Sequence, residues 1–182
     1  MSSADVTISP SLLEEISIRQ VAQTDLPALE WEGAYIHFRR VYARAFQRAR
    51  LGNALLWVVE RDPGVLIAQL FVLLKSESDP SIADGHQRAF IHSFRVRPQY
   101  RRRGLGACLL KHTEQDLLDR GYRWAYLHVA DDNPAASRFY ERSGYRRVST
   151  IEGDWSYEDH LGIERHVHEP GRRMAKELNR VN

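Results

Sequence analysis

The sequence predicts a single domain of the mixed α/β class, and three observations lead to this. Segments that read as strands, either alternating or continuously apolar, are interspersed with segments whose apolar residues recur at helical spacing. The 182 residues, 43% hydrophobic and 27% charged, are enough for one hydrophobic core and short for two. No repeat and no linker interrupts the pattern. We therefore expect one domain over residues 16–182, preceded by a loose tail over residues 1–15.

The first half of the domain reads as a strand, two helices and a pair of strands. Thr24-Asp25 offers an N-cap for a short helix. Aromatic and alanine side chains recur at helical spacing in a longer helix, with most of its arginines off that face. The two apolar strands that follow are joined by Arg61-Asp62-Pro63-Gly64, a typical hairpin turn. The predicted bounds are 16–21, 54–60 and 65–74 for the strands, and 26–31 and 35–50 for the helices.

The second half alternates between strands and helices that are punctuated by proline and glycine. Pro98 stops a strand, and Gly121 follows a helix as its C′ residue. Asn133-Pro134 supply the cap and the first position of another helix, which ends at Gly144. The predicted bounds are 90–96, 124–130, 145–151 and 172–178 for the strands, 104–120 and 133–143 for the helices, and 75–87 and 153–170 for the loops.

The charge balance and the single cysteine exclude several classes of protein. The 26 Lys and Arg nearly balance the 24 Asp and Glu, so the net charge of +2 indicates no polyanionic partner and we expect no nucleic acid. A nucleic-acid surface built on the arginines of residues 95–103 is the alternative, against which the balanced charge weighs. Cys108 alone forms neither an internal disulfide nor a cysteine metal cluster. Because no signal-peptide pattern and no apolar run of about 20 residues occurs, we expect a cytoplasmic protein that does not enter a membrane.

Residues 97–106, between a predicted strand and a predicted helix, form a candidate phosphate-binding turn. Gly104 and Gly106 let the backbone approach a ligand and leave amides free at the helix start, where the helix dipole adds positive charge. The three arginines at 101–103 add donors for phosphate oxygens. A capped surface turn with solvated arginines is the alternative. The turn is neither a Walker loop nor a dinucleotide fingerprint, because the Gly-Lys-Ser/Thr ending and the third glycine are missing.

The stretch Arg101-Arg102-Arg103-Gly104-Leu105-Gly106 resembles the signature Arg/Gln-x-x-Gly-x-Gly/Ala of the GNAT (general control N-acetyltransferase) superfamily. Residues 94–100 and 107–110 are similar to the family's flanking sequence. The resemblance implies a GNAT fold, with a bent mixed sheet of about seven strands and about four helices, splayed between the fourth and fifth strands to admit pantetheine. It also implies that the amides of residues 101–106 hold the pyrophosphate of acetyl-CoA and that the Val96 backbone pairs with pantetheine. The implied cofactor-binding residues are Phe94, Val96, Arg101, Arg102, Arg103, Gly104, Leu105, Gly106, Ala107, Asn133, Ala136 and Tyr140.

Residues 127–145 resemble a second signature of that family, in which an Asn after the fifth strand precedes a helix carrying Phe-Tyr and then Gly-Tyr/Phe. By this resemblance, Asn133 hydrogen-bonds pantetheine and Tyr140 stands near the thioester sulfur. A neutral phenol with a pKa of about 10 is suited to protonate the departing thiolate, so Tyr140 is the predicted general acid. The alternative is structural, with Phe139 and Tyr140 in the core and Asn133 serving only as a helix cap.

The general base is less evident, because the fourth strand (residues 88–96) lacks the carboxylate that relatives often carry there. By strand alternation, Phe90, His92 and Phe94 share one face, and the pKa of histidine suits base chemistry, so His92 is the candidate. A hydrogen-bonded structural histidine is the alternative. Asp131 and Glu60 are weaker candidates, and a chain of water molecules is a further possibility.

The acceptor site of the family is formed by its first two helices and the loop between its last two strands, here residues 31–50 and 153–170. The loop is acidic and aromatic, a combination that attracts cations, although a solvated loop explains it equally well. Glu164, His166 and His168 are close in sequence, but their spacing is weak evidence for a metal and we predict none.

The predicted function is transfer of an acetyl group from acetyl-CoA to a primary amine, of a small molecule or a protein, by direct attack. A non-catalytic acyl-CoA-binding module is the alternative, since the expected strand carboxylate is absent. Assembly into a homodimer stays open.

Overall fold

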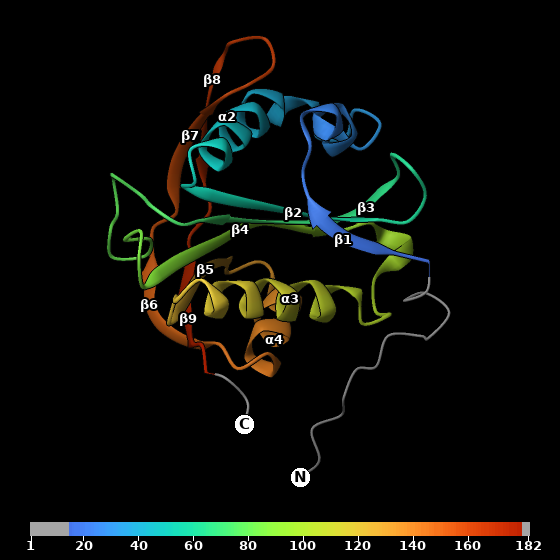
Figure 1. Ribbon diagram of the computed structural model, residues 1–182. Coiled ribbons are helices and arrows are strands. Elements are labelled where there is room, and N and C mark those ends of the chain that lie inside the picture. The colour runs from blue at the N-terminus through green and yellow to red at the C-terminus, as the bar shows by residue number, and fades with distance from the viewer. Residues whose placement is uncertain (1–14, 180–182) are drawn as a thin grey trace.

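The computed structural model describes residues 15–179 and is built around a mixed sheet (Figure 1). Seven strands lie in the order β1-β2-β3-β4-β5-β9-β6, as predicted in number, and β7 and β8 form a separate two-stranded sheet. The expected tail lies outside the described residues, apart from Glu15.

The strands are β1 (Ser17–Gln20), β2 (Ala54–Glu60), β3 (Leu66–Leu73), β4 (Arg88–Val96), β5 (Trp124–Ala130), β6 (Arg146–Ile151), β7 (Asp154–Glu158), β8 (Glu164–His168) and β9 (Gly171–Glu177). The helices are α2 (Arg39–Arg50), α3 (Leu105–Asp119) and α4 (Pro134–Arg142), with short 3-10 helices η1 (Gln23–Glu30), η2 (Ile36–Phe38) and η3 (Pro98–Tyr100).

Helices cover both faces of the seven-stranded sheet (Figure 1). We call the side covered by α3 and α4 the α3 face, and the side covered by η1 and α2 the α2 face; the β7–β8 hairpin stands beside α2. Leu70 and Leu109 belong to the core under α3, whereas Leu56 and Tyr42 belong to the core under α2. β2 and β3 are buried on both faces, which is why their sequences are continuously apolar. No helix within residues 15–179 has both the length and the apolar character needed to span a bilayer.

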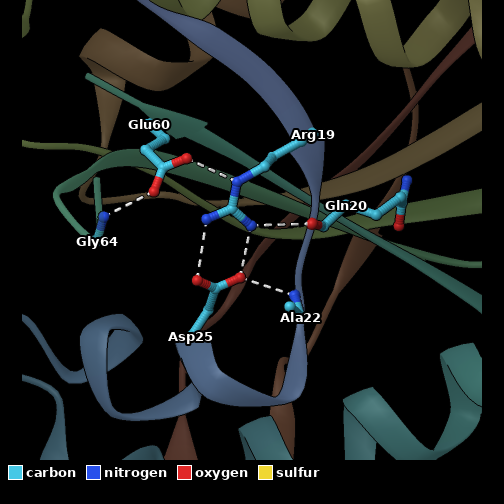
Figure 2. A network of polar contacts seen from close by, with 6 residues as sticks. All are labelled: Arg19, Gln20, Ala22, Asp25, Glu60 and Gly64. Carbon is cyan, nitrogen blue, oxygen red and sulfur yellow. Dashed lines mark hydrogen bonds and ion pairs between the residues drawn. The ribbon is translucent and has the colours of Figure 1, made fainter. Parts of the chain in front are cut away.

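The edge strand β1 is fixed to its neighbours through Arg19 (Figure 2). The Arg19 guanidinium donates to both carboxylate oxygens of Asp25, at 2.6 and 2.9 Å, and to Glu60 Oε2 at 2.8 Å. Each carboxylate also accepts a backbone amide at 2.7 Å, Asp25 from Ala22 and Glu60 from Gly64. The network therefore ties β1 to the start of η1 and to the β2–β3 turn.

The first helix differs from the prediction in type and in cap. It is a 3-10 helix with Pro27 inside it, and its N-cap is Ala22, which makes no side-chain cap hydrogen bond. Thr24 therefore does not cap the helix. Asp25 instead reaches back to the N-cap amide, as the third residue of a capping box does.

The fourth and fifth strands separate after a short parallel ladder. β4 and β5 pair from Arg88↔Trp124 to Ile91↔Leu127, and the ladder ends there although both strands continue. β5 pairs with β9 along its whole length, so the opening lies on its β4 side. The splay predicted between these strands is thus present.

β4 also contains a bulge at Ser93, whose φ is +51°. Opposite the two-residue step from Phe71 to Gln69 on β3, β4 advances three residues, from His92 to Arg95. Gln69 is fully buried and donates from Nε2 to the Ser93 carbonyl at 3.2 Å, which holds the irregular backbone in place.

The bulge changes which side chains share a face. Ile91 packs in the core of the α3 face, and His92 consequently lies on the α2 face. Beyond the bulge, Phe94 packs against the core of the α3 face, and Arg95 lies against aromatic rings on the α2 face. The prediction that Phe90, His92 and Phe94 share one face is therefore wrong for Phe94, because alternation assumes a regular strand.

The segment predicted as a charged loop contains the β7–β8 hairpin. Its turn is organised by Asp159, which is 2% exposed and accepts the amides of Leu161 and Ile163 and the Arg165 guanidinium. Burial alone would raise the pKa of Asp159, but these hydrogen bonds outweigh it and hold the pKa at about 2.

Candidate active site

A cradle of free backbone amides lies where η3 leads into α3. Arg102 has φ +59° and Gly104, the N-cap of α3, has φ +80°, and this left-handed backbone turns successive amides toward one side. Within residues 15–179, the amides of residues 102–107 donate to no protein acceptor. The Arg101 amide, which we expected in the cradle, donates instead to the Pro98 carbonyl at 3.2 Å. Six free amides at the positive end of a 15-residue helix are suited to bind an anion.

The three arginines of the turn have two different roles. Arg101 donates from Nε to the Val96 carbonyl at 2.8 Å, so it braces the end of β4. Arg102 and Arg103 are exposed and have no carboxylate within 4 Å in the described part of the chain. These two guanidinium groups therefore keep their donors and their charge for an anionic ligand.

The wall between the cradle and the splay is apolar. Phe94 and Val96 from β4 meet Gly106 on α3, where an added Cβ would lie 3.7 Å from Phe94 and 3.8 Å from Phe139. Leu105 is 1% exposed and serves in the core, so only its amide is offered to a ligand. The lack of a side chain at residue 106 lets α3 approach the open edge of β4.

On the opposite side of the splay, β5 ends and α4 begins. Asn133 accepts the Ala136 amide at 3.1 Å and thus caps α4, as its sequence context predicts. The Asn133 side chain is exposed, and its amide nitrogen donates to no residue among 15–179. A surface pocket at this point is lined by Asn133, Ser137 and Arg172, among others.

Tyr140 lies on the buried side of α4 and is 9% exposed. Its ring contacts Phe139, Tyr145 and Phe94, with centroids 5.1, 5.7 and 6.4 Å away. Its hydroxyl makes no hydrogen bond within the described residues. Burial raises the pKa of Tyr140 well above the usual value, so the phenol stays neutral and keeps a proton to donate.

His92 is the first β4 residue beyond the ladder with β5. Its ring stacks on Phe90 at 6.1 Å, and its Nδ1 lies 3.1 Å from the Ser93 hydroxyl. Burial, together with the positive charges of Arg48 and Arg95, lowers the pKa of His92 to about 4. The ring is therefore neutral at pH 7, and it is a weaker base than the ordinary histidine on which the sequence-based prediction relied.

His128 is the corresponding first residue of β5 beyond the ladder, so two histidines flank the opening. Its ring also contacts Phe90, at 4.7 Å. Burial and the charge of Arg173 lower the pKa of His128 to about 4. Arg173 donates from Nε to His128 Nε2 at 3.3 Å and pairs with Asp79 at 3.1 Å. With Nε2 accepting, the proton of the neutral ring is on Nδ1 and no basic lone pair is left.

The structure does not bring His92 and Tyr140 onto one face. Tyr140 contacts Phe94 on the α3 face, whereas His92 lies on the α2 face. The two weaker candidates for the base are already engaged, since Asp131 accepts from Arg172 at 3.2 Å and Glu60 binds Arg19.

An aromatic wall closes the α2 face between α2 and the hairpin. Phe38 contacts Tyr157 and Trp155 at 4.9 and 6.4 Å. The Arg95 guanidinium lies over Tyr35 at 4.1 Å and over Phe38 at 5.1 Å. The expected aromatic groups are therefore present at this side of the splay.

Two of the hairpin carboxylates, Glu158 and Asp159, are bound by arginines and are not available to a cationic acceptor. Glu158 binds both Arg40 and Arg44 of α2. Within residues 15–179, no three His, Cys, Asp or Glu side chains are grouped as metal ligands. The other carboxylates and their partners are Asp159 with Arg165, Asp154 with His168, Glu164 with Ser156 and Glu169 with Trp155.

Comparison with known proteins identifies the family. The family model described as Acetyltransferase (GNAT) family matches residues 18–145, which include the cradle, the splay and α4. The chain belongs to the GNAT acetyltransferase family. An uncharacterized N-acetyltransferase of Methanocaldococcus jannaschii is 28% identical over 152 residues, covering 79% of this chain and 66% of its own length. The chain thus spans just under two thirds of that curated relative.

Two solved GNAT structures show the same fold. The ribosomal-protein-S18-alanine N-acetyltransferase of Escherichia coli superposes with a TM-score of 0.65 at 21% identity, covering 92% of this chain and 96% of that one. The spermidine/spermine N-acetyltransferase SpeG of Vibrio cholerae gives a TM-score of 0.66 at 16% identity, covering 92% and 95%. The named acceptors of these two proteins differ in class, so the shared fold leaves the acceptor of this chain open.

Within this GNAT chain, the residue that sequence reasoning missed is His128. Its signal is positional: it is the residue after Leu127, the last partner of β4, as His92 is the residue after Ile91. Recognising the pair requires the register of the two strands, whose paired residues are 36 positions apart in the sequence. Nothing in the local sequence of either strand indicates this register.

Proposed function

We propose that this protein transfers an acetyl group from acetyl-CoA to a primary amine by direct attack of the amine on the thioester. The observation that carries the proposal is the set of six free amides at residues 102–107, beside the edge of β4 that is left unpaired once its ladder with β5 ends at Ile91. A nucleotide pyrophosphate fits the amides and the unpaired Arg102 and Arg103. An extended pantetheine fits the open edge of β4, because its amides replace the hydrogen bonds that a neighbouring strand would make.

The two faces of β4 then serve the two ends of the reacting group. The amine nitrogen attacks the carbonyl carbon, the C–S bond breaks, and one proton leaves nitrogen while one reaches sulfur. In this proposal the sulfur departs on the α3 side, and Tyr140, which lies on that side, supplies the proton as general acid. Burial keeps the phenol neutral, so it holds a proton that it can supply.

His92 is the proposed base on the α2 side. With Nδ1–H donating to the Ser93 hydroxyl at 3.1 Å, the Nε2 lone pair remains available for the amine proton. His128 lacks this lone pair because Arg173 donates to its Nε2. The acceptor is a small-molecule or protein amine entering along the aromatic wall.

Calorimetry with acetyl-CoA tests the cofactor site, with a matched pair of glycine variants. Gly104→Ala places a side chain on a left-handed residue inside the cradle and is expected to weaken acetyl-CoA binding at least tenfold, on the order of a lost pair of charge-assisted hydrogen bonds. Gly121→Ala strains an equally left-handed residue, φ +92°, with no atom within 4 Å of the new Cβ, and should leave affinity unchanged. Equal affinity of both variants, or wild-type protein that prefers inorganic pyrophosphate to acetyl-CoA, would overturn the assignment.

Catalysis is separated from binding by a panel of amines with release of coenzyme A thiol as the readout. Thiol release that depends on the amine supports transfer. Tight acetyl-CoA binding without amine-dependent release would favour the non-catalytic acyl-CoA-binding module.

A further inference from the structure

Arg95 is a half-buried cation without a protein anion. It follows the bulge and lies on the α2 face, with its guanidinium over the rings of Tyr35 and Phe38. Nη1 donates to the Tyr42 hydroxyl at 2.7 Å. No Asp or Glu lies within 4 Å of it in the segment 15–179. Since arginine side chains that are withdrawn from water normally have a carboxylate partner, Arg95 retains donors at its edge for a ligand.

The carboxylates that could have neutralised this region are bound elsewhere. The hairpin acid closest to α2, Glu158, is shared by Arg40 and Arg44. Asp159 is occupied by two amides and by Arg165. Asp154, Glu164 and Glu169 pair with His168, Ser156 and Trp155 and with no arginine in residues 15–179, so no arginine cancels their charge, and it is Arg95 that favours an anionic acceptor.

A second uncompensated cation comes from α2. Arg40, Arg44 and Arg48 recur every four residues and so lie along one side of the helix. Glu158 takes the first two, whereas Arg48 has no carboxylate within 4 Å among the described residues. Both Arg48 and Arg95 act electrostatically on His92, the proposed base. The acceptor side of the splay is thus positively charged at the point where an amine must approach.

This charge disfavours a polycation and favours an anion. A polyamine would bring further positive charge close to Arg95, where Glu158 and Asp159 are already bound by arginines. A carboxylate or phosphate matches the planar fork of a guanidinium that is already held by two rings and a tyrosine hydroxyl.

We propose that the acceptor amine carries an anionic group, a carboxylate or a phosphate, which binds Arg95 and thereby directs the amine to His92 and the open edge of β4. The inference rests on the proposed acetyl transfer. It specifies the acceptor class that the transfer uses.

Matched amine pairs test this proposal through kcat/KM for thiol release. One pair compares a free amino acid with its α-amide, and another compares O-phosphoethanolamine with ethanolamine; spermidine serves as the polycation. We expect kcat/KM to be about tenfold or more higher for the anionic member of at least one pair. A preference in the first pair indicates a carboxylate, and a preference in the second indicates a phosphate. Equal use of both members in the two pairs, or spermidine as the best substrate, would overturn the inference while leaving acetyl transfer intact.

Variants of the two arginines locate the anion. Arg95→Gln should raise KM for the anionic acceptor about tenfold or more, and by clearly less for its neutral partner. Arg48→Gln, at an exposed position, shows whether that charge also contributes. Calorimetry with acetyl-CoA verifies that each variant still folds and binds the donor. A preference that survives both substitutions refutes the assignment to these residues. Absence of thiol release with every amine counts against the proposed function, and this inference falls with it.

Discussion

The neutral state of His92 makes the fold sensitive to mild acid, and the size of the effect follows from its surroundings. The pKa of His92 is about 4 in the folded chain, against an ordinary value of 6.5, because of burial and of the charges on Arg48 and Arg95. A lowered histidine pKa means that the unfolded chain binds the proton more tightly. The contribution of His92 to stability is therefore complete above pH 6.5 and is lost as the pH falls toward 4.

The magnitude comes from linkage between protonation and folding. At about 1.4 kcal/mol per pH unit, the lowering of the pKa from 6.5 to about 4 amounts to about 3–4 kcal/mol well below pH 4, of which about 2 kcal/mol is lost by pH 4.5. The carboxylates of Asp84 and Asp159, with pKa values of about 2, lose their contributions mainly below pH 4. The interval from pH 7 to pH 4.5 is thus sensitive chiefly to histidines.

Urea unfolding at pH 7 and pH 4.5, followed by tryptophan fluorescence, measures this term in wild type and in His92→Gln. We expect the variant to lose about 2 kcal/mol less than wild type between the two pH values, because glutamine does not titrate. Any packing cost of the substitution is common to both pH values and cancels in the comparison. His166→Gln, at an exposed position, is the control and should match wild type. An unchanged pH difference in His92→Gln would refute the buried, cation-flanked environment assigned to His92.

Three further outcomes follow from contacts around the site. Tyr140→Phe should keep acetyl-CoA affinity by calorimetry and lower turnover about tenfold or more in the thiol assay; unchanged turnover removes the phenol from the mechanism. Lys176 Nζ donates to the carboxylate of Glu114 at 2.6 Å, and Glu114 is 9% exposed. Lys176→Met removes this donor and should lower the free energy of unfolding by about 3 kcal/mol. Adding Glu114→Gln removes the unpaired charge and should recover part of the loss. Gly171→Ala would place its Cβ 2.2 Å from the Val129 carbonyl oxygen. We expect this clash to lower the free energy of unfolding, measured with urea, by about 1–3 kcal/mol. A Gly171→Ala protein as stable as wild type would contradict that close approach.

Much of the fold is predictable because the residues that start and end its helices and strands act on their immediate neighbours in the sequence. β5 has the predicted bounds 124–130, and α4 starts at Pro134 behind its Asn133 cap, because proline and a capping side chain act on their own neighbours. The Gly104 turn is predictable for the same reason, since its left-handed backbone suits glycine.

The parts that were not predictable are set by tertiary contacts or by exposed strands. Ser93 adopts a positive φ, which its sequence does not favour, because β3 and Gln69 hold its carbonyl. The strands β7 and β8 are largely exposed, so they lack the apolar alternation by which a strand is recognised. Their hairpin depends on Asp159, whose role in the turn is evident only from its hydrogen bonds.

The bulge at Ser93 explains how one strand can serve two substrates. A regular strand would send Phe94 and His92 to the same face and Arg95 to the other. Because one extra residue is inserted, Phe94 lines the side of α3 and Tyr140, while His92 and Arg95 both point to the side of α2 and the aromatic wall. The groups we assign to the thioester and those we assign to the acceptor are therefore separated by the thickness of the sheet, and they meet only at the open edge beyond Ile91, where β5 no longer pairs. We therefore expect the charge of Arg95, which lies on the α2 side beside the aromatic wall, to select among the amines that approach this edge from that side.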